Sequence, residues 1–113
     1  MKRLVWLGDS RDRIRGFPPE AQRAAGYQLE RVQAGAMPAD WKPMPGVGLG
    51  VNELRVRMGG AYRVIYIAKF AEAIYVLHAF QKKTRKTPVA DRALARARFG
   101  ELVKERRRQW DGS

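Results

Sequence analysis

Cysteine, histidine and long apolar runs are missing or scarce in this sequence, and each absence excludes a class of chemistry. There is no cysteine, which excludes disulfide bonds, thiolate catalysis and cysteine-ligated zinc. His78 is the single histidine, so a histidine-rich metal site is excluded. The apolar residues 4–7 are too few for a signal-peptide core, and no run approaches a membrane span. We expect a cytoplasmic protein with no metal, cofactor or membrane partner.

Acidic residues are also scarce relative to basic ones. Lysine and arginine total 23 against 11 aspartate and glutamate, a formal net charge of +12, which favours a polyanionic partner. Residues 51–113 hold 15 basic and 6 acidic side chains, against 8 and 5 in residues 1–50. With 45% hydrophobic residues the chain can bury a core. We expect one domain over residues 1–113, with the polyanion site in its second half.

The first half of the chain predicts one strand, two helices and a long loop. Apolar residues favour a strand over residues 2–7. Ser10 is the candidate N-cap of a short helix over residues 11–15. Pro19 suits the first turn of a second helix, which ends before a left-handed Gly35. The proline- and glycine-rich residues 36–50 are typical of a loop.

The second half predicts three strands and a final helix. Apolar and polar residues alternate from Val51, and further strands follow over residues 61–69 and 74–80, as an antiparallel meander. Thr87 is the candidate N-cap of a helix that runs to about Arg108. The order β, α, α, β, β, β, α predicts an α+β fold, with two N-terminal helices and one C-terminal helix packed on a small antiparallel sheet.

The first hairpin of the meander has two possible registers, and a one-residue slip moves a strand's side chains to the opposite face. A two-residue loop splits the arginines of the two strands between faces. A three-residue loop over residues 58–60, with Gly60 left-handed, pairs Arg55 with Arg63 and puts Arg57 on the same face. The apolar pattern on the other face favours this second register. An anion such as phosphate would then offset the repulsion among the three arginines.

Three segments, taken in order, carry a family resemblance. They are Glu53-Leu54-Arg55, Tyr62-Arg63-Val64-Ile65-Tyr66 and LHAFQKKTRKTP at residues 77–88. Together with the order of elements, they resemble the HigB-like, phage-derived branch of the RelE/ParE toxin superfamily over nearly the whole chain. The most specific pattern is Phe-x-Lys-Lys-Thr-x-Lys-Thr-Pro, at the end of the third segment.

The resemblance implies the toxin of a type II toxin-antitoxin system, an endoribonuclease that cleaves mRNA, commonly on the ribosome, and so inhibits translation and growth. A helix-turn-helix antitoxin is the implied protein partner. In RelE-type enzymes the ribose 2′-hydroxyl attacks the adjacent phosphate without a metal ion, and cations stabilise the added negative charge. The expected partners are therefore mRNA, the ribosome and the antitoxin, with no small-molecule cofactor.

The resemblance also points to particular basic residues. Arg63 aligns with the strand arginine that contacts the scissile phosphate, and its planar fork suits that contact; the alternative is an exposed arginine paired with Glu53 or Glu72. The catalytic candidates are Arg63, Lys82, Lys83 and Arg85. The RNA-binding candidates are Arg55, Arg57, Lys86 and Arg107. For all but Arg63 the alternative is a solvated surface charge.

Other conspicuous side chains have structural explanations. We expect His78 to be half-buried and hydrogen-bonded, and Tyr66 to pack in the core. Trp41 and Trp110 could stack on bases, but anchoring a loop or a terminus is the commoner use. Some RelE-like enzymes use a C-terminal tyrosine for proton transfer, whereas this chain has no tyrosine after residue 75. Lys82 or Lys83, with a pKa lowered by nearby cations, is the candidate proton acceptor.

Two other functions stay open. ParE-type relatives share the fold but poison DNA gyrase without a nuclease site, although the Lys-Lys-Thr-x-Lys-Thr-Pro segment favours the HigB-like branch. A non-catalytic nucleic-acid-binding module would also account for the net charge and the aromatic residues. Transcript cleavage separates the first alternative from a nuclease. A variant that binds RNA without arresting growth separates binding from chemistry.

Overall fold

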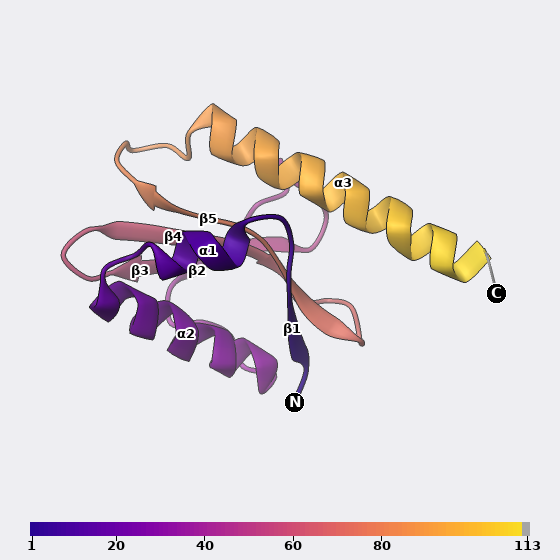
Figure 1. Cartoon of the computed structure of the whole chain (residues 1–113), viewed down its shortest axis with the longest axis horizontal. Coiled ribbons are helices and arrows are strands. Elements are labelled where there is room, and N and C mark those ends of the chain that lie inside the picture. Colours follow the sequence, from indigo (N-terminus) through magenta and orange to yellow (C-terminus); the bar gives the residue numbers. More distant parts are fainter. Residues whose placement is uncertain (112–113) are drawn as a thin grey trace.

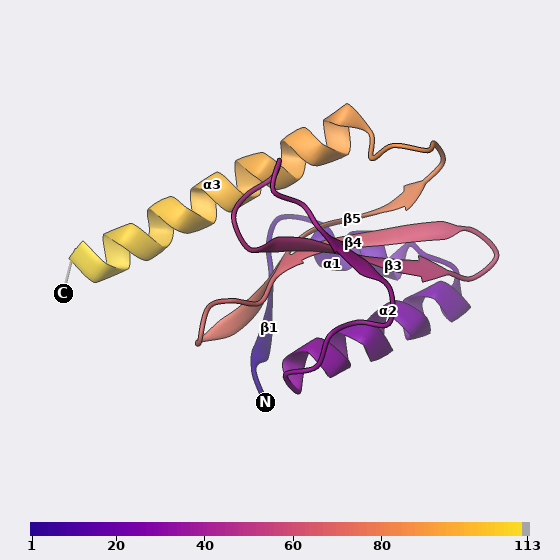
Figure 2. The ribbon, with the colours of Figure 1, turned by 180° about the vertical axis from the view of Figure 1, so that it is seen from behind.

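A five-stranded sheet lies between two N-terminal helices on one face and a long C-terminal helix on the other (Figure 1, Figure 2). The computed structural model describes residues 1–111. In chain order the elements are β1 (Arg3–Trp6), α1 (Ser10–Arg15), α2 (Pro19–Gln33), β2 (Trp41–Pro43), β3 (Val51–Arg57), β4 (Ala61–Ile67), β5 (Ala73–Lys82) and α3 (Val89–Asp111). The predicted α+β fold is confirmed, and the element order fits the RelE-like fold. Within residues 1–111 no helix is long and apolar enough to cross a bilayer.

The strands lie in the order β1-β5-β4-β3-β2. β1 runs parallel to β5, whereas the other neighbouring strands are antiparallel. The sheet is therefore mixed, and the prediction of an antiparallel sheet was wrong for β1. The direction of β1 could not be predicted because its partner strand is distant in the sequence: Arg3 of β1 pairs with Ala73 of β5. A local sequence pattern does not show which distant strand pairs with β1, or in which direction.

The short strand β2 lies inside the segment 36–50 that was predicted to be loop. Three residues are too few to show an alternating pattern, and Pro43 within them is tolerated in a strand only at the edge of a sheet. β2 is such an edge strand, and its Lys42 pairs with Glu53 of β3. This pairing puts Lys42 on the same sheet face as Glu53.

The hairpin between β3 and β4 has the three-residue loop that the sequence favours, because Arg55 lies opposite Arg63. The residue with positive φ is Gly59, at +72°, so the prediction of a left-handed Gly60 was wrong. Either of two adjacent glycines can adopt this conformation at no steric cost, and the sequence does not distinguish them. The N–H of Met58 donates to the carbonyl of Gly60 at 3.1 Å and closes the loop.

Apolar residues cover both faces of the sheet. On the first face, α1 and α2 pack against the strands in a cluster of Ile14, Phe17, Ala21, Ala25, Leu29, Val32, Leu54, Val56, Tyr62, Val64, Tyr66, Ile74, Val76 and Ala79. On the second face, α3 and the segment after β2 pack in a cluster of Met44, Val47, Val51, Ile65, Ile67, Leu77, Phe80, Ala95 and Leu102. The segment approaches α3 closely, since a Cβ on Gly48 would clash with the ring of Phe99.

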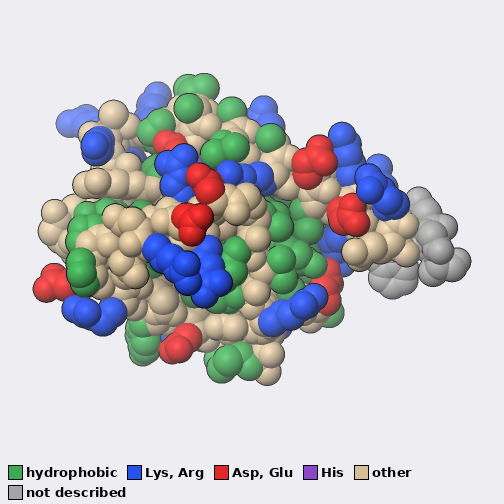
Figure 3. Space-filling view, viewed as in Figure 1, with side chains coloured by type: hydrophobic (Ala, Val, Ile, Leu, Met, Phe, Trp, Pro, Cys, Tyr) green, Lys and Arg blue, Asp and Glu red, His purple; other side chains and the backbone are tan. Residues whose placement is uncertain are grey.

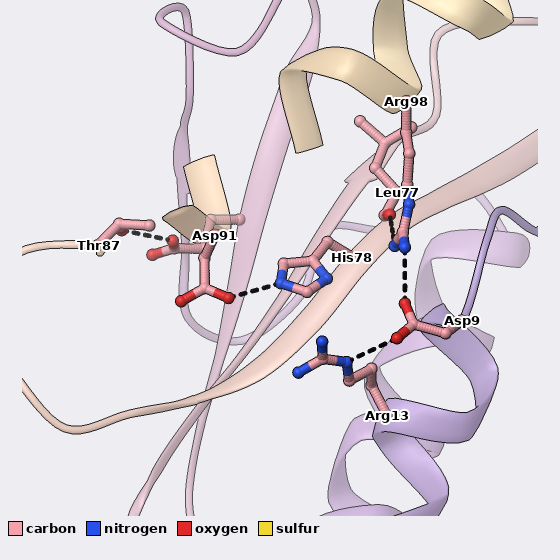
Figure 4. Close-up of polar contacts among 8 residues, drawn as sticks. Asp9, Arg13, Leu77, His78, Thr87, Asp91 and Arg98 are labelled. Atoms are coloured by element: carbon pink, nitrogen blue, oxygen red, sulfur yellow. Dashed lines mark hydrogen bonds and ion pairs between the residues drawn. The ribbon is translucent and has the colours of Figure 1, made fainter. Parts of the chain in front are cut away.

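A β-bulge in β5 fixes how α3 lies on the second face. A register shift against β4 leaves Leu77 as the extra residue of β5. Arg98 of α3 donates to the Leu77 carbonyl at 2.8 Å and to Asp9 at 2.7 Å (Figure 4). Nearer the start of α3, Asp91 Oδ1 lies 2.7 Å from Nε2 of His78. His78 is hydrogen-bonded as predicted, but it is fully rather than half buried.

Two hydroxyl groups predicted as helix N-caps bind the sheet instead. Ser10 is the first residue of α1, makes no cap, and donates to a backbone carbonyl of β5 at 3.2 Å. Thr87, two residues before α3, donates to Oε2 of Glu53 at 3.1 Å. Both predictions were wrong. Each hydroxyl group donates to an oxygen atom of a distant strand instead of accepting a hydrogen bond from an N–H group of its own helix. The left-handed Gly35 after α2 is confirmed, with φ of +90°.

Candidate functional site

The second sheet face carries basic side chains in rows at the end nearest the β3–β4 loop. Arg55 of β3 lies opposite Arg63 of β4. One row nearer the loop, Ala61 of β4 lies between Arg57 of β3 and Lys82 of β5. Residues two apart on a strand face the same way, so the predicted grouping of the three arginines on one face is confirmed. The structure adds Lys82 to this group.

A buried carboxylate organises these arginines. Glu53 is fully buried, and its Oε1 lies 3.3 Å from Nε of Arg63 and 3.6 Å from Nε of Arg55. Arg63 is itself only 3% exposed, and burial lowers its pKa against the opposing effect of Glu53. The three atoms are not aligned for hydrogen bonds. The carboxylate therefore holds both guanidinium groups by charge and leaves the Nε of each without a hydrogen-bond acceptor.

Cations outnumber acids around this carboxylate. Lys42 lies opposite it on β2, and the second nearby acid, Asp40, has its Oδ1 4.0 Å from NH1 of Arg55. The pKa of Lys82 is lowered, first by burial and then by the charge of Arg63, with Lys42 among the further cations that lower it. The surplus of positive charge favours an anion at this face.

The segment 83–88, between β5 and α3, adds a second group of cations beside the sheet. Its Thr87 ties the segment to Glu53 through the hydrogen bond described above. Between this segment and β2 lies a cleft of about 270 Å³. The basic side chains that line the cleft are Lys42, Arg85, Lys86 and Arg92.

Net charge alone would not have located this site. On the face shown in Figure 3, Lys and Arg side chains are spread over the segment between β5 and α3, the centre of the view and the C-terminal part of α3, with acidic groups among them. Within the described residues 1–111, no three His, Asp or Glu side chains gather in a group that could hold a metal ion. The sheet register and the cleft, rather than the charge total, distinguish the site.

Comparison with known families agrees with the resemblance. Residues 12–100 match the family described as Phage derived protein Gp49-like (DUF891). The chain belongs to the Gp49-like family. This family is related to the RelE/HigB toxin superfamily, so the predicted relationship is confirmed at the level of the Gp49-like family. The matched residues include both the arginine cluster and the cleft.

A search of curated proteins gives no match to the Gp49-like chain. The roles of individual residues are therefore argued from the geometry of this chain alone.

The Gp49-like chain does not bring all the predicted site residues together. Arg63 is paired with Glu53 but is buried, so the alternative of an exposed arginine was wrong; Glu72 pairs with Arg106 instead. Lys83 is exposed and does not line the cleft. Arg107 is 18 residues beyond the start of α3, about 27 Å along the helix at 1.5 Å per residue. An RNA contact at Arg107 would thus be separate from the site.

Two of the aromatic residues considered from the sequence, Tyr66 and Trp41, lie away from the site. Tyr66 is buried in the cluster on the first face, as predicted, and burial raises its pKa to about 12. Trp41 pairs with Leu54, which places its side chain on the face opposite that of Lys42. The side chain of Trp110 lies outside the described part of the structure.

Three residues of the site were not found from the sequence of this Gp49-like chain. Glu53 was considered only as a surface partner of Arg63, although its spacing of two from Arg55 already places it on the arginine face. Lys42 reaches the site through the pairing of β2 with β3, and Arg92 through the packing of α3. Neither of these placements has a local sequence pattern.

Proposed function

We propose that this Gp49-like protein is an mRNA endoribonuclease, the toxin of a type II toxin-antitoxin system that inhibits translation. The observation that carries the proposal is the surplus of cations around a buried ion pair, with Arg55, Arg57, Arg63 and Lys82 on one face against Glu53. A backbone phosphate of RNA supplies the anion that this arrangement favours. Family membership supports the proposal, since the Gp49-like family is related to RelE-like toxins.

In the proposed reaction the ribose 2′-oxygen attacks the adjacent phosphorus and the bond to the 5′-oxygen breaks. The products are a 2′,3′-cyclic phosphate and a 5′-hydroxyl. Arg63 and Arg55 stabilise the negative charge that builds on the phosphoryl oxygens. Lys82 accepts the proton of the 2′-hydroxyl. The departing 5′-oxygen takes up a proton from solvent or from segment 83–88, where Lys83 and Arg85 are the candidates.

The function is tested with purified protein and an RNA oligonucleotide, with a metal chelator present and with the RNA free or bound to ribosomes. We expect cleavage to give the two product ends named above, faster on the ribosome. An oligonucleotide with 2′-deoxyribose at the cleaved position is the matched control and should stay intact, because it lacks the attacking hydroxyl. An intact all-ribose RNA under both conditions would contradict the nuclease proposal.

The same proposal is tested in cells by mapping transcript 5′ ends after the protein is induced. New ends within coding regions, with growth restored by co-expression of a helix-turn-helix antitoxin, are the expected result. DNA breakage without new transcript ends would instead support gyrase poisoning. RNA binding without either kind of damage would support a non-catalytic nucleic-acid-binding module.

The proton-acceptor role of Lys82 predicts a pH-dependent rate. The neutral amine is the active form, so cleavage should rise with pH, and the rise should centre below 10.5 because the pKa of Lys82 is lowered. Lys82→Arg keeps the charge but stays protonated, and should lose the rise and roughly a hundredfold in rate. Cleavage rates measured across pH for Lys82→Arg and for Lys83→Arg show which of the two lysines accepts the proton. A rise lost only in Lys83→Arg would move the role to Lys83.

A further inference from the structure

The cleft beside β2 is small, and all of its charged lining side chains are basic. Its volume of about 270 Å³ is far above the ~10–15 Å³ that a cavity needs to hold one water molecule, so a phosphate group of five heavy atoms fits. Four cations line it and none of its lining residues is acidic. Among the described side chains, no carboxylate lies within ion-pair distance of Lys42, Arg85, Lys86 or Arg92.

Both walls of the cleft are fixed by hydrogen bonds. Arg96 of α3 donates to the carbonyl of Gly46 at 2.9 Å through Nε, which holds the wall formed by residues 43–46. Thr87 holds the opposite wall through Glu53. Walls that are already ordered bind a ligand with a smaller loss of conformational entropy.

The cleft also adjoins the arginine cluster. Lys42 lines the cleft, lies opposite Glu53 in the sheet, and is among the charges that lower the pKa of Lys82. Thr87 likewise belongs to the cleft wall and bonds Glu53. Lys42 is two strands away from Arg63 and two residues along the strand, because its partner Glu53 lies opposite Ile65. The two backbones are therefore about 12 Å apart, at a strand spacing near 4.8 Å and a rise near 3.4 Å per residue. A few nucleotides of single-stranded RNA span this separation.

We propose that this cleft binds a second backbone phosphate of single-stranded RNA, flanking the phosphate that is held at Arg63. The proposal rests on the proposed function and deepens it, because it adds a binding subsite outside the reacting atoms. Lys42 and Arg92 are the new contacts. They fix the path of the RNA strand from the sheet face toward the start of α3, so their contribution falls on RNA binding more than on chemistry.

The test is the double variant Lys42→Gln/Arg92→Gln, with an RNA oligonucleotide that carries 2′-deoxyribose at the cleaved position. Binding is measured across salt concentrations. Loss of one phosphate contact should weaken binding on the order of tenfold and reduce the slope of log affinity against log salt by about 0.7. With cleavable RNA, the change should appear in KM more than in kcat.

The matched control is Arg15→Gln/Arg23→Gln, which removes two exposed charges from α1 and α2 on the opposite sheet face. Thermal unfolding of both double variants checks that each is folded. Equal affinity and equal salt slope in the two variants would overturn the cleft proposal while wild-type cleavage still stands. Wild-type protein that binds RNA through the cleft but leaves all-ribose RNA intact would overturn the nuclease proposal alone.

Discussion

Replacing Arg63 with lysine is expected to reduce RNA cleavage by roughly a hundredfold to a thousandfold, the effect typical of losing one donor to a developing oxyanion. Lysine keeps the positive charge beside Glu53, so the buried carboxylate stays compensated and the protein should fold. It lacks the planar fork that contacts two phosphoryl oxygens at once. The measurement is the single-turnover rate with saturating RNA, which reports the chemical step without the binding step.

Arg57→Lys is the matched control for this prediction. Arg57 lies on the same strand face but is exposed, one row from Arg63, so the same change there should alter the rate much less. The unfolding midpoints of both variants show whether either loss comes from unfolding. A fully active Arg63→Lys variant with a normal midpoint would contradict a direct phosphate contact at Arg63.

The arginine face could be predicted from the sequence because an alternating strand pattern fixes faces once the register is known. Arg55, Arg57 and Arg63 follow from this one choice, and the apolar residues of the other face decide it. The finer choice between Gly59 and Gly60 could not be made, since both lack a side chain that would exclude one conformation. The alternating sequence pattern thus predicted which sheet face carries the arginines, but not the geometry of the β3–β4 loop.

The parts of the site that were missed all depend on contacts between distant segments. Lys42 lies on an edge strand that is too short to recognise from the sequence. Thr87 was expected to cap α3, but its hydroxyl group donates to the carboxylate of Glu53, 34 residues away. Arg63 shows a further limit of sequence reasoning. An ion pair and a phosphate contact were treated as alternatives, whereas Arg63 pairs with Glu53 through Nε and its guanidinium carries further N–H donors. The ion pair and a phosphate contact are therefore compatible.

Removing the Glu53 carboxylate is expected to have the largest effect on stability. Glu53→Ala leaves the buried guanidinium of Arg63 without its acid, and breaking a buried pair in this way costs about 3–5 kcal/mol. For a chain of this length the unfolding midpoint should fall on the order of 10–20 °C. Urea unfolding measures the free energy of unfolding of Glu53→Ala and of the control Glu105→Ala. Glu105 pairs with Arg108 at the surface, so losing its carboxylate should cost under about 1 kcal/mol.

The variant Glu53→Gln distinguishes two roles of the carboxylate, which are to position the arginines and to stabilise the fold. The amide oxygen still accepts from Thr87, so this variant should fold better than Glu53→Ala, yet it no longer attracts Arg63 and Arg55 by charge. The site becomes more positive, so binding of the 2′-deoxy RNA should be unchanged or tighter. Cleavage at saturating RNA should nevertheless fall at least tenfold, because the arginines are no longer held where the charge develops. A Glu53→Gln variant with wild-type kcat would show that the carboxylate stabilises the fold without positioning the arginines.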